Sequence, residues 1–257
     1  MAIKTEEIIL KSRAAKEFSA KPQTICEIFS YQPENIEQLP LGNLYIVAEL
    51  SCVKDCGHLS NLLASIIKRE YYLYPERGAL KSFRAALKKA NTHLAELAKQ
   101  GNLEWLGKFH FICASVAKDD MLFVQAGQAH AYVARQGHFM DLTRKIIPES
   151  GRPHPSKTFS SIVTGKTEID DKIVFATPYL TQVISINGLR QILINHDELL
   201  DISDQINKIM REQEKISPLA VLLLKIENEE PIEEKTQTTV KPKRFITPPI
   251  DLGQILQ

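Results

Sequence analysis

The sequence predicts an α+β domain, arranged as a four-layer α-β-β-α sandwich of two mainly antiparallel sheets flanked by helix pairs. Three observations lead to this class. Short segments with strand character come first, a pair of amphipathic helical segments follows, and a second series of strands comes after them. A further helical region and a final apolar strand then follow. Several strands are apolar along their whole length, which requires a covering layer on each face.

The composition is that of an ordinary globular protein. The chain has 257 residues, of which 44% are hydrophobic and 25% charged,. A net charge of +1 argues against a nucleic-acid surface or a polybasic membrane anchor,. No apolar run approaches the roughly 20 residues of a membrane helix, and the start of the chain lacks the pattern of a signal peptide. The four cysteines fit reduced thiols, so we expect a cytoplasmic protein,. From the net charge and the lack of a membrane segment we expect no nucleic acid or membrane partner,.

The first part of the chain, up to about residue 55, contains extended segments. They read "EEIILKS", "QTICEIFSY" and "NLYIVAEL". The third is unbroken in its apolar character over residues 44–48, which predicts a strand that is covered on both faces,. The stretch "QPENIEQLPLG" between the second and third segments has the prolines and the glycine of a loop,.

Two helices are predicted next, over about residues 57–72 and 79–98. Apolar residues recur at intervals of three and four in both, which places them on one face of each helix. In the second helix these residues are Leu80, Phe83, Leu87, Ala90, Leu94 and Leu97. Lys88, Lys89 and Lys99 lie off this stripe and are predicted to form a solvated face. The two helices should form a hairpin, because "YPERG" separates them.

A run of short apolar segments follows the helices. The segments "KFHFICASVA", "DMLFVQAG", "HAYVARQG" and "HFMDLT" are separated by tight turns, which predicts a β-meander,. Two further strands are expected in "FSSIVTG" and "KIVFAT", then helices over about 180–212, then a strand over 219–226. We expect the helices at 57–98 to cover one outer face and those at 180–212 the other.

The composition changes after residue 227. The stretch "ENEEPIEEKTQTTVKPKR" has few large apolar residues and many charges, so it is predicted to be a disordered linker,. The domain is therefore assigned to residues 1–227 and the tail to 228–257. Residues 245–256 regain apolar character, which suits a short segment that docks on a protein partner; packing back on the domain is the other interpretation,.

Four of these pieces, in this order, resemble the metal-dependent protein phosphatases of the PPM or protein phosphatase 2C family. "LYIVAEL" resembles the family strand that ends in Val-Ala-Asp-Gly, and "LFVQAGQAHAYVARQGHFMDLT" resembles its Gly-Asp-Ser hairpin. "DDKIVFATPYL" resembles the strand that ends in Thr-Asp-Gly-Leu, and "ISPLAVLLLKI" resembles the final strand, which opens with Asp-Asn. The resemblance covers about residues 1–228 and implies the same four-layer fold.

The departures from the family fall where its members hold two divalent cations with aspartates. The family's Asp positions correspond to Glu49, Gln128, Pro178 and Ser217 in this chain. Of these side chains only Glu49 has a carboxylate, which makes it the single metal-ligand candidate. The resemblance therefore implies a platform without catalytic residues, and we expect no cofactor; the alternative is Mg²⁺ or Mn²⁺.

The leading functional hypothesis is a PPM-like pseudophosphatase, a catalytically impaired phosphatase-fold domain that acts as a binding or regulatory module for a protein partner. The first alternative is an active metal-dependent Ser/Thr phosphoprotein phosphatase with a rearranged site built from Glu49, Asp55 and Asp171. The second alternative is an unrelated α+β binding domain.

Two other constellations have simpler explanations. Cys52, Cys56 and His58 in "SCVKDCGH" have the residue types of zinc ligands, but a loop entering a helix with two ordinary thiols is the preferred interpretation,. "SIVTGKT" resembles the end of a phosphate-binding loop, yet Ser160 stands where that motif needs glycine,. A hairpin turn is predicted there instead.

Overall fold

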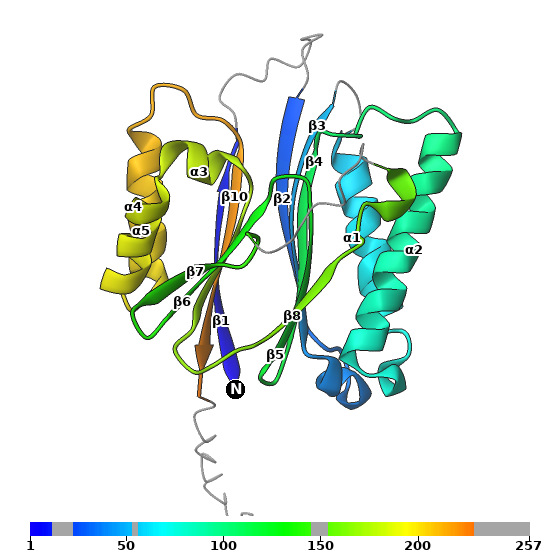
Figure 1. The fold of residues 1–257 in the computed structure, drawn as a ribbon, viewed down its shortest axis with the longest axis horizontal. Coiled ribbons are helices and arrows are strands. Elements are labelled where there is room, and N and C mark those ends of the chain that lie inside the picture. Colours follow the sequence, from blue (N-terminus) through cyan, green and yellow to red (C-terminus); the bar gives the residue numbers. More distant parts are fainter. Residues whose placement is uncertain (12–22, 53–55, 145–153, 229–257) are drawn as a thin grey trace, which may run out of the picture.

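Two stacked sheets form the centre of the molecule, with helices on both outer faces (Figure 1). The computed structural model describes residues 1–11, 23–52, 56–144 and 154–228. Within these residues each sheet has five strands, and the neighbouring strands of each sheet pair antiparallel. The predicted four-layer α-β-β-α sandwich is therefore confirmed.

Sheet A contains the first and the last of the described strands, together with three strands from between them in the chain. Its strand order is β1-β10-β9-β6-β7. The bounds are Ala2–Leu10 for β1, Leu219–Glu227 for β10, Lys172–Ala176 for β9, His130–Arg135 for β6 and His138–Asp141 for β7.

Sheet B has the order β2-β3-β4-β5-β8. The bounds are Gln23–Tyr31 for β2, Asn43–Cys52 for β3, Phe109–Ala117 for β4, Asp120–Ala126 for β5 and Ile162–Lys166 for β8. A 3-10 helix, η1, occupies Ile36–Leu41 within the segment predicted to be a loop.

The helices cover the outer faces as predicted. α1 (Cys56–Tyr72) and α2 (Ala79–Lys99) pack on sheet B, joined through the 3-10 helix η2 (Pro75–Arg77). α3 (Tyr179–Val183), α4 (Ile186–Asn195) and α5 (Leu199–Arg211) lie over sheet A. Another 3-10 helix, η3 (Pro155–Lys157), lies beside α2.

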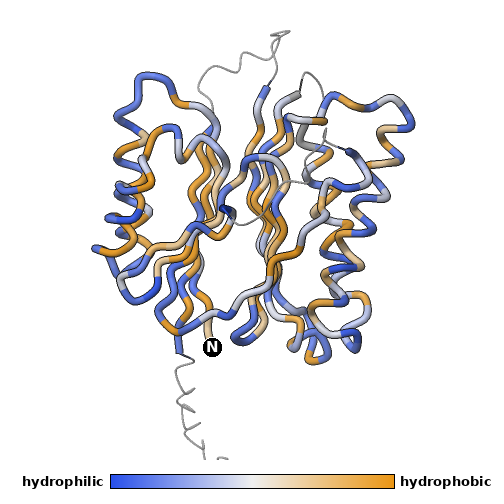
Figure 2. The backbone as a smooth tube through the Cα atoms, in the orientation of Figure 1, coloured by the Kyte–Doolittle hydropathy of each residue, from blue (hydrophilic) through white to orange (hydrophobic). Residues whose placement is uncertain are grey.

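Three apolar layers result from this stacking, and Figure 2 shows apolar residues along the strands of both sheets. The side chains of β3 show how one strand contributes to two of these layers, because they point alternately to its two faces. Leu44, Ile46 and Ala48 face α1 and α2, while Tyr45 and Val47 face the other sheet. Each of these residues is buried, so the unbroken apolar run at 44–48 reflects a strand covered on both faces,.

Two topological predictions were wrong. The expected meander is divided between the sheets, because β4 and β5 belong to sheet B whereas β6 and β7 belong to sheet A. The expected hairpin at "SIVTGKT" is also absent from the described residues: β8 pairs with β5, and β9 pairs with β10 and β6. In both cases the chain crosses from one sheet to the other.

The final strand, β10, ends at Glu227. Residues 229–257, which make up nearly all of the predicted tail, lie outside the described residues. No helix in the described parts of the chain has the length and apolar character needed to cross a membrane.

Candidate functional site

Several strand ends meet at one edge of the two sheets, drawn at the top of Figure 1. In sheet A, Ala176 at the end of β9 pairs with His130 at the start of β6 and with Val221 near the start of β10. In sheet B, Glu49 near the end of β3 pairs with Cys26 on one side and His110 on the other. The side chains of this edge that face the other sheet form the candidate site.

Glu49 is the carboxylate of this edge. It follows Tyr45 and Val47 in the alternation of β3, so its side chain points between the sheets. The Cys26 Sγ lies 3.8 Å from the Glu49 Oε2 and is placed to donate to it. Burial raises the pKa of Glu49, and hydrogen bonds from Thr177 and Cys26 partly offset the rise,. The carboxylate is thus held by two protonated side chains of the same chain.

Cys26 is an unreactive thiol at this position. It is buried and free, and burial, followed by the nearby charge of Glu49, raises the pKa of its thiol far above its ordinary value. A thiol in this environment stays protonated, so it suits hydrogen-bond donation and not nucleophilic attack.

Thr177 links the edge of sheet A to Glu49. Its side chain is fully buried, and its hydroxyl oxygen accepts a hydrogen bond of 3.2 Å from the Ala220 backbone N–H. The hydroxyl hydrogen therefore remains available to donate to the carboxylate. The next residue, Pro178, is the N-cap of α3 and offers neither a carboxylate nor a backbone N–H,. Tyr179 turns away, and its hydroxyl donates to the Lys215 carbonyl at 2.7 Å.

His110 and Gln128 complete the edge on the side of sheet B. The Gln128 backbone N–H donates to the His110 Nδ1 at 3.0 Å. Burial, and then the proximity of His130, lower the pKa of His110, so its ring is neutral at pH 7,. Gln128 therefore takes part through its backbone amide.

Gly127 makes this approach of Gln128 to β4 possible. Its φ is +68°, and a Cβ at this residue would lie 2.3 Å from the Phe109 carbonyl oxygen and 2.4 Å from the His110 Nδ1. No other residue type fits this backbone conformation and this distance together.

The donor set does not fit a pair of hard divalent cations. Such ions need several oxygen ligands, and a two-metal site needs carboxylates to balance its charge. Of the four positions singled out by resemblance, Glu49 has a carboxylate, Gln128 uses its backbone, Pro178 is buried and Ser217 is exposed. No group of three or more His, Cys, Asp or Glu side chains that could hold a metal is found among residues 1–11, 23–52, 56–144 and 154–228.

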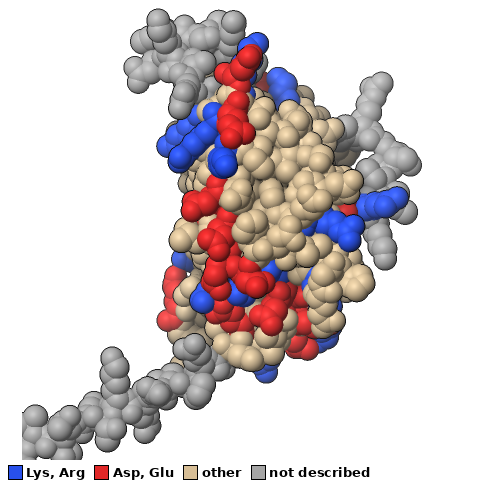
Figure 3. Space-filling view, turned by 90° about the vertical axis from the view of Figure 1, so that its left-hand side faces the viewer, with Lys and Arg blue, Asp and Glu red and all other residues tan. Residues whose placement is uncertain are grey.

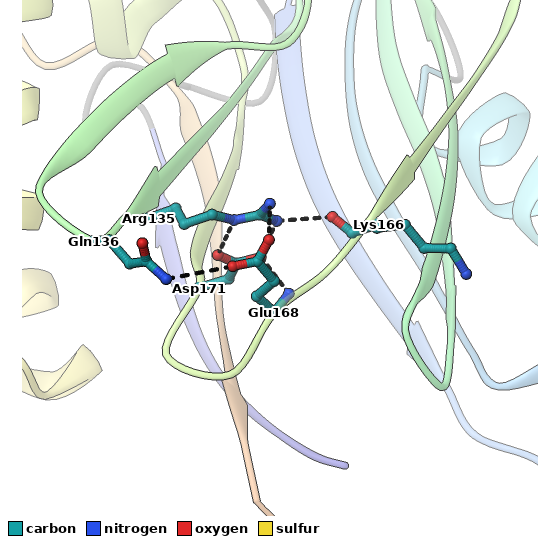
Figure 4. A network of polar contacts seen from close by, with 5 residues as sticks. All are labelled: Arg135, Gln136, Lys166, Glu168 and Asp171. Carbon is teal, nitrogen blue, oxygen red and sulfur yellow. Dashed lines mark hydrogen bonds and ion pairs between the residues drawn. The ribbon is translucent and has the colours of Figure 1, made fainter.

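The rearranged metal site of the alternative hypothesis cannot form as expected, because Asp171 lies elsewhere. Asp171 precedes β9 and Thr177, which contacts Glu49, follows it, so Asp171 lies about 20 Å along the strand from Thr177,. Asp171 is fully buried and accepts from Arg135 Nε at 2.7 Å and from Nη2 at 2.6 Å (Figure 4). Its role is structural. Asp55, the third member of that set, lies outside the described residues.

The possible zinc ligands were Cys52, Cys56 and His58. His58 is exposed, and the side chains of Cys52 and Cys56 lie outside the described residues. The "SIVTGKT" stretch is not a phosphate-binding loop, because Gly165 lies within β8 and pairs with Met121.

Sequence reasoning missed Cys26 and His110 as members of the edge. Their proximity depends on strand register, in which Cys26 and His110 flank Glu49 on adjacent strands. Thr177 had been matched to the Thr of the family's Thr-Asp-Gly-Leu, and the even spacing of Ile173, Phe175 and Thr177 is a second signal, since it places all three on the face toward sheet B.

Comparison with solved structures shows the fold to be that of the 2C-type protein phosphatases. The catalytic domain of the serine/threonine phosphatase PstP, in complex with two manganese ions, matches with a TM-score of 0.65 at 12% identity, over 88% of this chain and 99% of that one. A bacterial serine phosphatase matches with a TM-score of 0.66 at 17% identity, over 90% and 100% of the two chains.

Stp1 from Staphylococcus aureus, a serine/threonine phosphatase, matches with a TM-score of 0.61 at 16% identity, over 89% of this chain and 96% of that one. No model of a known protein family matches the sequence, and a search of curated proteins finds no match. At these identities the likeness establishes the fold.

Proposed function

We propose that this phosphatase-fold domain is a pseudophosphatase that does not hydrolyse phosphoesters and acts as a binding or regulatory module for a protein partner. One observation carries the proposal: at the edge where both sheets end, Glu49 is the sole carboxylate among the inward-facing side chains described above, and a thiol and a hydroxyl hydrogen-bond to it. The structurally similar PstP domain holds two manganese ions.

The chemistry of the edge supports an inactive site. In-line hydrolysis on two metal ions needs concentrated positive charge to activate water and to stabilise the leaving oxygen. Two dications beside a single carboxylate would repel each other largely uncompensated, so tight binuclear binding is not expected. The remaining groups, a protonated Cys26, a neutral His110 and the Thr177 hydroxyl, supply neither that charge nor an activated nucleophile,.

The partner remains a protein in this proposal. The net charge of +1 gives no support for nucleic acid,. Residues 245–256, outside the described part of the chain, stay a predicted docking segment, and the surface of the domain is the other place where a partner would bind.

Phosphatase assays with added metal test the proposal. Purified protein with millimolar Mn²⁺ or Mg²⁺ should leave p-nitrophenyl phosphate and a phosphothreonine peptide intact, and calorimetric titration should show no tight binding of Mn²⁺. The matched gain-of-ligand variant combines Glu49→Asp, Gln128→Asp and Pro178→Asp, and it leaves the buried Leu50 unchanged. This variant should bind Mn²⁺ more tightly than the parent. Metal-dependent turnover by the unmodified protein, abolished by EDTA and by Glu49→Ala, would overturn the proposal.

A further inference from the structure

A groove of about 600 Å³ lies on the outer side of sheet B, between α2 and the segment that runs from η3 into β8. It belongs to the helix layer, away from the edge that holds Glu49. Leu87, Ala95 and Ile162 contribute apolar surface, and Ser160 contributes a hydroxyl. The groove is therefore a separate feature of the molecule.

The wall opposite α2 is fixed by two hydrogen bonds and a buried ring. The Asn91 side chain donates to the Phe159 carbonyl at 3.0 Å and accepts from the Phe159 N–H at 2.9 Å. The Phe159 ring is buried against Phe109 and Phe111. Because one side chain satisfies both backbone groups of Phe159, this segment holds a constant position beside the helix and the groove is preformed.

The groove carries an excess of positive charge. Arg84, Lys88 and Lys99 line it at helical positions that share one face of α2, and all three are exposed,. None of the three forms an ion pair with another described residue. Glu96 is the acidic residue in the lining, and it lies 3.6 Å from the His93 Nδ1. Lys88 and Lys99 are exposed, which confirms the solvated face predicted from the sequence, and they also line this groove.

This charge is local. The whole chain has a net charge of +1, and the opposite outer face, over α4 and α5, shows a band of acidic side chains along one margin (Figure 3). A ligand attracted to the groove would therefore be guided by Arg84, Lys88 and Lys99 and not by the overall charge of the protein.

We propose that this groove binds an extended, carboxylate-rich segment of a partner protein. Arg84 and Lys99 are separated by about 22 Å along the helix axis, which corresponds to about seven residues of extended chain. Such a segment places carboxylates near the cations at both ends while its backbone lies over Ala95 and Ile162. The inference rests on the binding-module part of the proposed function and names the surface and the chemistry of its partner.

Fluorescence anisotropy with a labelled glutamate-rich peptide of about seven residues tests the site. The variant Arg84→Ala/Lys88→Ala/Lys99→Ala should weaken binding by about tenfold or more, and rising salt should weaken binding to the parent protein. The matched control Arg190→Ala/Lys208→Ala/Arg211→Ala removes three exposed cations from α4 and α5, outside the groove, and should bind as the parent does. Ala95→Glu keeps the cations, adds a carboxylate to the groove, and should also weaken binding.

The site would be refuted if the groove variant bound the peptide as tightly as the parent, or if the control lost as much affinity as the groove variant. Binding of a single-stranded DNA oligonucleotide as tightly as the peptide would also refute it. Melting curves of each variant separate loss of binding from loss of folding. The outcome is independent of the phosphatase assays: metal-dependent turnover with intact peptide binding would reject the inactive site alone, and inert protein without peptide binding would reject the groove alone.

Discussion

Arg135 joins the two sheets at the end of the molecule opposite Glu49, and replacing it should cost much of the stability of the domain. Its guanidinium binds Asp171 with two nitrogens, donates to Glu168 Oε1 at 2.7 Å, and donates to the Lys166 carbonyl at 2.7 Å (Figure 4). Arg135 belongs to β6 in sheet A, whereas Lys166 ends β8 in sheet B. One side chain therefore connects the two sheets.

The magnitude follows from burial. The Asp171 side chain has no exposed area, while 23% of the Arg135 side chain is exposed. Arg135→Met would leave the Glu168 N–H, at 2.8 Å, as the remaining hydrogen-bond donor to the Asp171 carboxylate among the described residues. Removing one partner of a buried pair costs about 3–5 kcal/mol, and the partial exposure of Arg135 places the expected loss near about 3 kcal/mol. For a domain of this size that is a fall in Tm of about 6–12 °C.

Urea unfolding followed by circular dichroism measures this loss. The control Lys166→Ala lies at the same place and breaks ion pairs to Asp119 and Asp120, whose side chains are mostly exposed, so it should cost much less than Arg135→Met,. The double variant Arg135→Met/Asp171→Asn should be less destabilised than the sum of the single changes, because no uncompensated charge remains buried. A loss for Arg135→Met no larger than that for Lys166→Ala would refute the argument.

Two further predictions concern the candidate site. Burial raises the pKa of Glu49, so the folded protein favours the protonated carboxyl more than the unfolded chain does,. The stabilisation from the protonated carboxyl is fully present below the unfolded-state pKa. It is lost as pH rises through the folded-state pKa, because ionising the buried carboxyl opposes folding. Glu49→Gln should therefore be more stable than the parent at neutral pH and gain less at about pH 4, measured by urea unfolding at both pH values; an equal gain at both would contradict this. Gly127→Ala should lose at least about 2 kcal/mol, because its Cβ would meet the Phe109 carbonyl, whereas Gly137→Ala, with a φ of +77° and nothing within 4 Å, should lose about 1 kcal/mol,. Similar losses for the two glycine variants would show that the close approach to β4 is unimportant.

The layers of the fold could be predicted from the sequence because burial leaves a local pattern. The apolar run at 44–48 requires cover on both faces, and the stripe of α2 requires one buried face,. The assignment of strands to sheets leaves no such pattern. The short connection at Gly127 and Gln128 looks like a hairpin turn, yet β6 pairs with β9, whose residues lie some forty positions later in the chain,.

The candidate site could be predicted only in part, because the register of paired strands also leaves no local pattern in the sequence. Resemblance to the phosphatases identified Glu49 and the substitutions at residues 128, 178 and 217. It gave no information on Cys26 or His110, because their contact with Glu49 arises from the register of three adjacent strands. A shift of one residue in either pairing would turn these side chains to the opposite face of the sheet.

The polar groups described at this edge of the sheets are hydrogen-bonded within the protein, and Glu49 is the one carboxylate among them. Thr177 accepts from Ala220, Tyr179 donates to Lys215, and the His110 ring accepts from the backbone of Gln128. In a metal site, carboxylates at such positions repel one another until cations bind, so the ions contribute to the stability of the fold. Here the corresponding groups are neutral or are hydrogen-bonded to each other. The scaffold can therefore keep its shape without a bound ion, as the proposed pseudophosphatase requires.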